Sequence, residues 1–433
     1  MNSEKGPHRG LKGFDMRNDA FSNINSNFQF DFQNPGRIIF GVNVIKDKFY
    51  QLIEELEATN VLLISDKIIK GKGLLNEICN KLEKAGIIYR EYLFPISGEP
   101  LLESIRTAVD YARADHFDLF IGVGGGSILD LTKIMAIMSS NKGDLGDYRV
   151  TVKNIGTEKI KNYGSNTILI PTTAGTGAEV TNTATFIENK VKYWVCSNKL
   201  FPKVSCIDPL LTSTMPKNVT RDTGLEALGN LIEGCISNYA NPLSDGMIQQ
   251  GVHLIYLNLP IAYRDGHDFS ARTAMSFAAM MGGWVVDFPW SSVPSVGHCI
   301  SEIIGPRYNL PHGLCTGLML PHAIDFNVPY INNKIRLILE SFEVDTHRMD
   351  SSQVAKESVK MILDLMENMG LSIALKDIAE GTKLELLDLR KFVLEERQYL
   401  YGLPKFSPRK LNKKNVDILL ADLWEGRFHN TGL

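Results

Sequence analysis

Residues 121–133, IGVGGGSILDLTK, decide the fold of this chain. An apolar run over residues 119–123 ends in three glycines and a serine, and a helical pattern begins at Ile128. Glycines let backbone N–H groups approach an anion, and the helix dipole favours negative charge at the helix N-terminus. The pattern therefore predicts a phosphate-binding turn between a buried strand and a helix. A tight turn without a ligand is the alternative, because one glycine-rich turn has low specificity.

Predicted strands and helices alternate on both sides of this stretch. Continuous apolar runs are typical of strands buried on both faces of a parallel sheet. The order predicts a Rossmann-like, doubly wound α/β domain, in which ligands bind at the carboxyl ends of the strands. Strands are predicted at residues 37–41, 60–64, 87–93, 119–123 and 166–170, and helices at residues 50–58, 74–85 and 101–115.

Two further features belong to this predicted domain. Asp66 follows a predicted strand, where a carboxylate can accept both hydrogen bonds of a ribose diol and repel a 2′-phosphate. Its alternative role is the N-cap of the segment that follows. Residues 171–181, PTTAGTGAEVT, offer hydroxyl groups and close backbone approach to a polar ligand lying across a cleft. A plain Thr/Gly loop is the alternative, which the neighbouring glycine turn disfavours.

Length and composition limit the class of protein. A chain of 433 residues is too long for one ordinary core, so we expect two domains. The formal net charge of −3 creates no field that attracts nucleic acid or an anionic membrane. No apolar stretch is long enough to span a bilayer, and the polar N-terminus does not resemble a signal peptide. The six scattered cysteines indicate buried thiols in a cytoplasmic protein.

The second half of the chain has a different pattern. Strand-like runs end near Asp208, and helical patterns continue to the C-terminus. We therefore predict a polar N-terminal extension at residues 1–27, an α/β domain at 28–213 that starts with a strand at 28–32, and an all-helical domain at 214–433. Helices are predicted at residues 223–238, 243–257, 269–285, 354–369, 384–394 and 416–425.

Residues that could hold a metal ion occur in the helical half. Several have a spacing of four, which places two side chains on one helix face. Carboxylates and imidazoles from two helices and a turn can close around one divalent ion. A surface carboxylate or a hydrogen-bonded core histidine is the usual alternative for any one of them. The candidates are Glu226, Asn230 and Glu233 on one predicted helix, His298 and Glu302 on another, and His312 in a turn bounded by Pro311 and Gly313.

From residue 28 onward the chain resembles the iron-containing (group III) alcohol dehydrogenases. The resemblance rests on successive motifs in the same order, which is far more specific than any single motif. It implies a dinucleotide-binding domain, a helical domain with a catalytic metal, and an active site between them. The motifs are NPGRIIFG, GVGGGSILDLTK, PTTAGTGAEVT, DPLLTSTMP, TGLEALGNLIE, ANPLSD, YNLPHG and LPHAIDFN.

The resemblance also implies cofactor-binding positions. Gly124, Gly125, Gly126 and Ser127 correspond to the pyrophosphate site, with Asp130 and Lys133 in the helix that follows. Thr172, Thr173, Thr176 and Val180 correspond to the nicotinamide end, and Lys192 to a lysine that contacts the cofactor. Asp66 lies where family members that prefer NAD(H) over NADP(H) carry an aspartate.

The metal-binding positions depart from the family pattern of one Asp and three His. Glu226 stands at the Asp position and Asn230 at the first His position, while His298 and His312 are retained. Glu302 replaces a nearby histidine that is often assigned to proton transfer. Glutamate keeps the charge but extends the side chain by a methylene, and asparagine is a weak ligand. We therefore expect weaker binding of Fe²⁺, Zn²⁺ or Mn²⁺ than is usual in the family.

Three hypotheses follow for the activity. In the first, Glu302 joins Glu226, His298 and His312 around a metal, and the protein is an alcohol dehydrogenase or aldehyde reductase. In the second, the metal is lost, Glu302, Glu226 or a histidine acts as acid or base, and the reaction has diverged. In the third, the protein is a catalytically inactive paralogue. The reading adopted is a cytoplasmic NAD(P)-dependent oxidoreductase, with Glu302, His298 and His312 as catalytic residues. We expect a homodimer that acts on a small alcohol or carbonyl substrate, without nucleic-acid or membrane partners.

Overall fold

The structure is a computed structural model that describes residues 36–95, 98–150, 159–287, 295–381, 383–397 and 407–433. The extension predicted at residues 1–27 and the strand predicted at 28–32 lie outside the described residues. No helix in the described ranges is long and apolar enough to cross a membrane. All six cysteines are free thiols. Four of them are buried, whereas Cys79 and Cys196 are half-buried.

The described N-terminal strands form a six-stranded parallel sheet, which confirms the α/β prediction. Every residue of β4 and β5 is buried apart from Asn166, as expected for strands that are covered on both faces. The order across the sheet is β1 (Arg37–Phe40), β8 (Val204–Ile207), β5 (Asn166–Pro171), β4 (Leu119–Gly124), β2 (Asn60–Asp66) and β3 (Ile88–Phe94).

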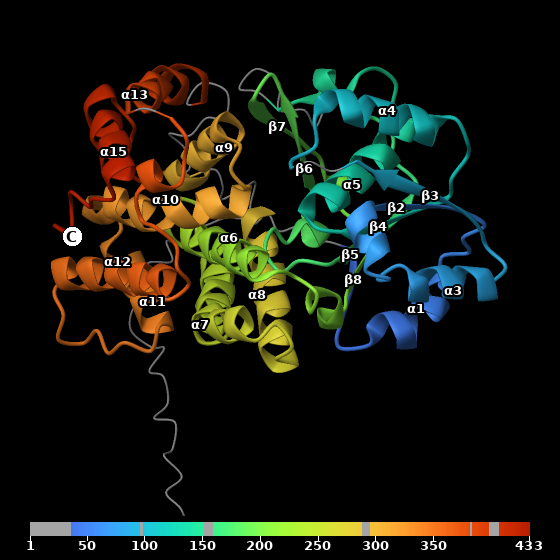
Figure 1. The fold of residues 1–433 in the computed structure, drawn as a ribbon, viewed down its shortest axis with the longest axis horizontal. Helices are drawn as coiled ribbons and strands as arrows, with labels where there is room; N and C mark the ends of the chain where they lie inside the picture. The colour runs from blue at the N-terminus through green and yellow to red at the C-terminus, as the bar shows by residue number, and fades with distance from the viewer. Residues whose placement is uncertain (1–35, 96–97, 151–158, 288–294, 382, 398–406) are drawn as a thin grey trace, which may run out of the picture.

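Helices pack on both faces of this sheet (Figure 1). One apolar cluster joins the sheet to α1 (Val44–Glu55) and α3 (Asn76–Lys84), and a second joins it to α4 (Leu102–Arg113) and α5 (Gly126–Ser140). The glycine turn therefore connects the carboxyl end of the central strand β4 to a helix, as predicted. The short α2 (Lys67–Gly71) follows β2.

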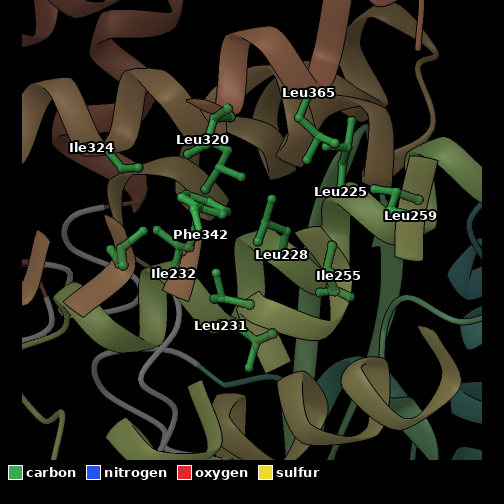
Figure 2. Packing of buried hydrophobic residues seen from close by; sticks show 14 of the residues in the cluster. Leu225, Leu228, Leu231, Ile232, Ile255, Leu259, Leu320, Ile324, Phe342 and Leu365 are labelled. Atoms are coloured by element: carbon green, nitrogen blue, oxygen red, sulfur yellow. The ribbon is translucent and has the colours of Figure 1, made fainter. Parts of the chain in front are cut away.

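The described residues after β8 form helices joined by loops, without a strand, in agreement with the predicted all-α region. Its central helix is α6, which is buried from Gly224 through Ile236 and packs leucines and isoleucines against the surrounding helices (Figure 2). The boundary at residues 213 and 214 stays a prediction. The main helices are α6 (Lys217–Ile236), α7 (Pro242–Arg264), α8 (Phe269–Asp287), α9 (Val296–Tyr308), α10 (His312–Asn327), α11 (Asn332–Ser341), α12 (Ser351–Glu367), α13 (Lys383–Lys391), with a π-helical continuation at Phe392–Arg397, and α15 (Lys413–Glu425).

An antiparallel hairpin that the sequence analysis missed lies between the two halves of the molecule (Figure 1). It consists of β6 (Thr183–Glu188) and β7 (Val191–Cys196), joined by Asn189 and Lys190, which both have positive φ. Such two-residue turns usually contain glycine at the second position, and the lysine here concealed the signal. The remaining signal for a strand was the alternation of Thr183 and Thr185 with the apolar Ala184 and Phe186.

The sheet region and the helical region meet at a direct contact between two backbones. Gly177 has φ +62°, and an added Cβ on Gly283 of α8 would lie 2.4 Å from the Gly177 carbonyl oxygen. No side chain can move aside there, because the atoms in the way are backbone atoms. Glycine at both positions is therefore required for this close approach.

We predict that Gly283→Ala lowers the free energy of unfolding by about 1–3 kcal/mol, because it overpacks this contact. Denaturant unfolding monitored by circular dichroism measures the change. Gly246→Ala is the matched control, since Gly246 lies in α7 with no atom within 4 Å of the added Cβ. The control should be neutral or stabilising by up to about 1 kcal/mol. Equal stability of both variants would show that the two backbones can separate freely.

Candidate functional site

A cavity of about 830 Å³ lies between the sheet region and the helical region. Its walls come from the glycine turn, the threonine loop at residues 172–181, the hairpin and the helices α6, α9 and α10. It lies at the carboxyl end of the central strands, where parallel α/β sheets bind ligands. Most of the predicted site residues line it: Gly125, Gly126, Ser127, Asp130, Thr173, Thr176, Lys192, Glu226, Asn230, His298, Glu302 and His312.

The N-terminus of α5 faces this cavity without a side-chain cap. Gly125 is the N-cap residue, with φ −74° and ψ 179°, and its side of the turn is open to the cavity. An added Cβ on Gly124 or Gly126 would instead lie 2.6 Å from a side-chain atom of Ile128 or Thr176, respectively. The first N–H groups of a helix have no intrahelical acceptor. Backbone N–H groups and the helix dipole thus offer an anion site here.

The threonine loop supplies a second part of the wall. Thr173 and Thr176 line the cavity. Thr172 and Val180 are not among its lining residues. The Thr172 N–H donates to the Gly124 carbonyl at 2.9 Å, which ties the ends of β4 and β5 together. Val180 packs in a small apolar cluster with Ile207 and Met280.

Asp130 and Lys133 fix the hairpin to α5. One carboxylate oxygen of Asp130 accepts from the N–H and hydroxyl of Thr185, both at 2.9 Å, and the other lies 3.1 Å from the Lys133 ammonium. Lys133 is buried and also donates to the Ala178 carbonyl at 2.9 Å and to the Thr181 hydroxyl at 3.0 Å. Both side chains therefore position the loop and the hairpin.

Lys192 and Asp66 occupy different environments. The Lys192 ammonium lies in the cavity wall, 2.9 Å from Glu99. Burial opposes its charge, but the neighbouring carboxylates of Glu99 and Glu302 raise the pKa of Lys192. Asp66 is the N-cap of α2, where one oxygen accepts from the N–H groups of Ile68 and Ile69. It is not among the residues that line the cavity.

On the opposite wall, α6, α9 and α10 bring the acidic and imidazole groups together. The Nε2 atom of His312 lies 3.7 Å from Oε1 of Glu226, and the rings of His298 and His312 have centroids 5.6 Å apart. His312 is the first residue of α10, so the prediction that it lies in a turn was wrong. Pro311 is the N-cap residue that directly precedes this helix.

Glu233 orients His298. Its Oε1 lies 2.9 Å from the His298 Nδ1, and its Oε2 accepts from the His298 N–H at 3.2 Å and from the Ser295 hydroxyl. Burial lowers the pKa of His298, but the Glu233 carboxylate outweighs it, so that the pKa is raised. Glu233, a candidate ligand by spacing, thus acts through His298.

Burial dominates the ionisation of the other two groups. It raises the pKa of Glu226 to about 7, against the attraction of Lys192. Burial and the positive charge of Lys192 lower the pKa of His312. Both groups are therefore shifted toward their neutral forms.

The arrangement does not fit a tightly held metal ion. Among the described residues, no group of three or more His, Cys, Asp or Glu side chains is placed to hold one. Oε1 of Glu302 accepts a hydrogen bond from the indole Nε1 of Trp194 at 3.1 Å, which commits one of its two oxygens. The amide of Asn230 is a weak ligand.

Comparisons with known proteins agree with this architecture. The family model for iron-containing alcohol dehydrogenase matches residues 35–209, and the C-terminal model of the same family matches residues 220–422. Long-chain-alcohol dehydrogenase 1 of Geobacillus thermodenitrificans is 34% identical over 65% of this chain and 69% of its own length. NAD-dependent methanol dehydrogenase of Bacillus methanolicus is 28% identical over 83% of this chain and 91% of its own length. The solved structure of an alcohol dehydrogenase from Oenococcus oeni superposes with a TM-score of 0.83 at 27% identity, covering 92% of this chain and all of the other.

A parallel sheet with an open helix N-terminus thus faces acid and imidazole groups of an all-helical region across one cavity. The chain belongs to the iron-containing alcohol dehydrogenase family, and its relatives are alcohol oxidoreductases.

Glu179 of the threonine loop leads to a prediction about pH. Burial raises the pKa of Glu179 from its ordinary value of 4.5 to about 7. A carboxyl with a raised folded-state pKa stabilises the fold below pH 4.5, and this contribution is lost as the pH rises to about 7. We predict that Glu179→Gln gains up to about 3 kcal/mol over the parent between these two pH values. Denaturant unfolding at a series of pH values measures this difference, and a pH-independent difference would contradict the assignment.

Proposed function

We propose that this protein transfers a hydride between a nicotinamide dinucleotide and a small alcohol or carbonyl compound in the interdomain cavity. The observation that carries the proposal is that one cavity contains both the open N-terminus of α5 and the acid and imidazole groups of α6, α9 and α10. The first side offers an anion site and the second can move a proton. Alcohol oxidation requires both, because a hydride and a proton leave the substrate together.

The sheet side fits the dinucleotide. The N–H groups at Gly125, Gly126 and Ser127 would hold the pyrophosphate, since a side chain on Gly125 would fill the space that the anion needs. Thr173 and Thr176 would line the nicotinamide end. When bound, the nicotinamide supplies the hydride acceptor or donor.

NAD(H) is the proposed form of the cofactor. Asp66 ends β2 beside the strand that leads to α5, and its carboxylate would repel a 2′-phosphate. Its hydrogen bonds to the start of α2 hold the carboxylate in place at this strand end. The methanol dehydrogenase relative is NAD-dependent by name.

His312 is the proposed proton acceptor in alcohol oxidation. Its lowered pKa keeps the imidazole neutral, so one ring nitrogen has a free lone pair for the hydroxyl proton, and the same shift makes it a weak base that needs the proton to be passed on. The buried Nδ1 of His312 has no hydrogen-bond partner among the described residues. Glu302 and His298 are each fixed by a hydrogen bond from another element, and they are the groups proposed to orient the substrate oxygen.

We predict that Gly125→Val weakens NADH binding at least tenfold, because the branched side chain fills the proposed anion site. The backbone at Gly125 suits any residue, so the variant should fold. Isothermal titration calorimetry with NADH measures the affinity. Gly125→Ala is the matched control: its Cβ would meet Thr173 at an ordinary contact distance of 3.4 Å and should cause a smaller loss. Unchanged NADH affinity in a folded Gly125→Val protein would refute the phosphate-site assignment.

We also predict that protein purified without added metal contains well under one Fe, Zn or Mn per chain, because no three His, Cys, Asp or Glu side chains of the described residues are placed to hold one ion. Elemental analysis measures the content, and turnover is compared before and after treatment with a chelator. One ion per chain whose removal abolishes turnover, and whose content falls in His312→Ala, would instead support a metal-dependent dehydrogenase.

A further inference from the structure

One face of the β6–β7 hairpin forms a wall of the cavity, and its other face packs into the core. Thr183, Thr185 and Ile187 of β6, together with Lys192 and Trp194 of β7, line the cavity. The alternate residues Ala184, Phe186 and Val195 are buried in the core shared with α4 and α5. Because successive side chains of a strand point to opposite faces, the core packing fixes which residues face the cavity.

This wall is attached to the helix that forms the anion site. Asp130 of α5 accepts two hydrogen bonds from Thr185, and Lys133 of α5 donates to the loop that leads into β6. The carbonyl of Trp194 also accepts from the Val150 N–H at 2.8 Å. These bonds hold the hairpin to the sheet region, while β7 also lies against α9 of the helical region.

A side-chain hydrogen bond crosses from this wall to the helical region. The indole Nε1 of Trp194 donates to Oε1 of Glu302 on α9 at 3.1 Å. Helix α9 also carries His298, whose ring is bound by Glu233 of α6. In Figure 1 the hairpin lies between α5 and α9. A continuous series of contacts thus leads from α5 through the hairpin to α9 and α6.

We propose that Trp194 is a positioning residue that acts through Glu302: their hydrogen bond couples occupancy of the anion site at α5 to the placement of α9, and so sets the reacting geometry across the cleft. The proposal rests on the proposed function and extends it to a residue outside the dinucleotide and acid–base sets. A hydride moves between groups held on two different regions, so an error of about 1 Å in their separation is costly.

The hydrogen bond between Trp194 and Glu302 has a carboxylate oxygen as its acceptor. Hydrogen bonds to ionised groups contribute more than neutral ones, and Glu302 is buried in the cavity wall. The indole N–H therefore has a carboxylate acceptor at a part-buried position in the cavity wall. The series Asp130, Thr185, Trp194 and Glu302 gives the coupling a defined physical route.

The kinetic test is a double-mutant cycle with Trp194→Phe and Glu302→Met. Trp194→Phe keeps an aromatic ring but removes the donor, and we expect kcat to fall about tenfold while KM for the nucleotide changes less than twofold. In the Glu302→Met background, Trp194→Phe should have no further effect, because the acceptor is already absent. Independent, additive losses would overturn the proposal, as would an unchanged kcat in Trp194→Phe.

Tyr193→Phe is the matched control on the same hairpin. Tyr193 stacks on Phe186 and lies beside Arg149, and it is not among the cavity residues. Its kcat should stay within twofold of the parent. A loss as large as that of Trp194→Phe would show that any disturbance of the hairpin suffices, and would overturn the specific role of Trp194.

Hydrogen exchange gives a second readout that needs no turnover. NADH should slow exchange of the amides of α9 in the parent and in Glu302→Gln, whose amide oxygen can still accept from Trp194, but not in Trp194→Phe. Retained protection of α9 in Trp194→Phe overturns the coupling. Absence of protection at the start of α5 in the parent contradicts the dinucleotide site itself, so that failure of the proposed function is distinguishable from failure of this inference.

Discussion

The buried ammonium group of Lys133 joins the elements that enclose the cavity. It donates to backbone carbonyls of the threonine loop and of Thr183 and is paired with Asp130 on its own helix. A buried ammonium is tolerated only when acceptors and an opposite charge surround it. This requirement fixes the loop and the hairpin relative to α5, so the open helix N-terminus, the threonines and Trp194 face the same space.

On the helical side, desolvation has the largest effect on the ionisable groups. Burial moves Glu226 toward neutrality against the attraction of the buried Lys192, and burial and Lys192 together move His312 toward neutrality. A neutral imidazole keeps one ring nitrogen free to accept a hydrogen bond or a proton. His298 differs because Glu233 holds its ring and favours its charged form. The two histidines, His298 and His312, thus differ in their preferred charge because their neighbours differ.

Much of the fold could be predicted because its strands carry continuous apolar runs. The strands β2, β4 and β5 were located to within a few residues because both faces of each are buried. Helix α10 was not predicted, and α9 was predicted only as a helix that carries His298 and Glu302, without bounds. Both helices are buried on nearly every side over most of their length and contain a proline, so they show no amphipathic period. The hairpin was missed because its turn lacks glycine.

The sequence by itself determined the alternation of strands and helices, the glycine turn before α5 and the types of residue available for chemistry, since these follow from local periodicity and backbone freedom. Only the tertiary structure decided which of those residues share a cavity. Lys133 became a positioning residue, Thr172 and Val180 lie away from the cavity lining, and Trp194 joined Glu302 although 108 positions separate them. Such pairings depend on how two regions pack, and packing brings together side chains whose separation along the chain carries no local signal.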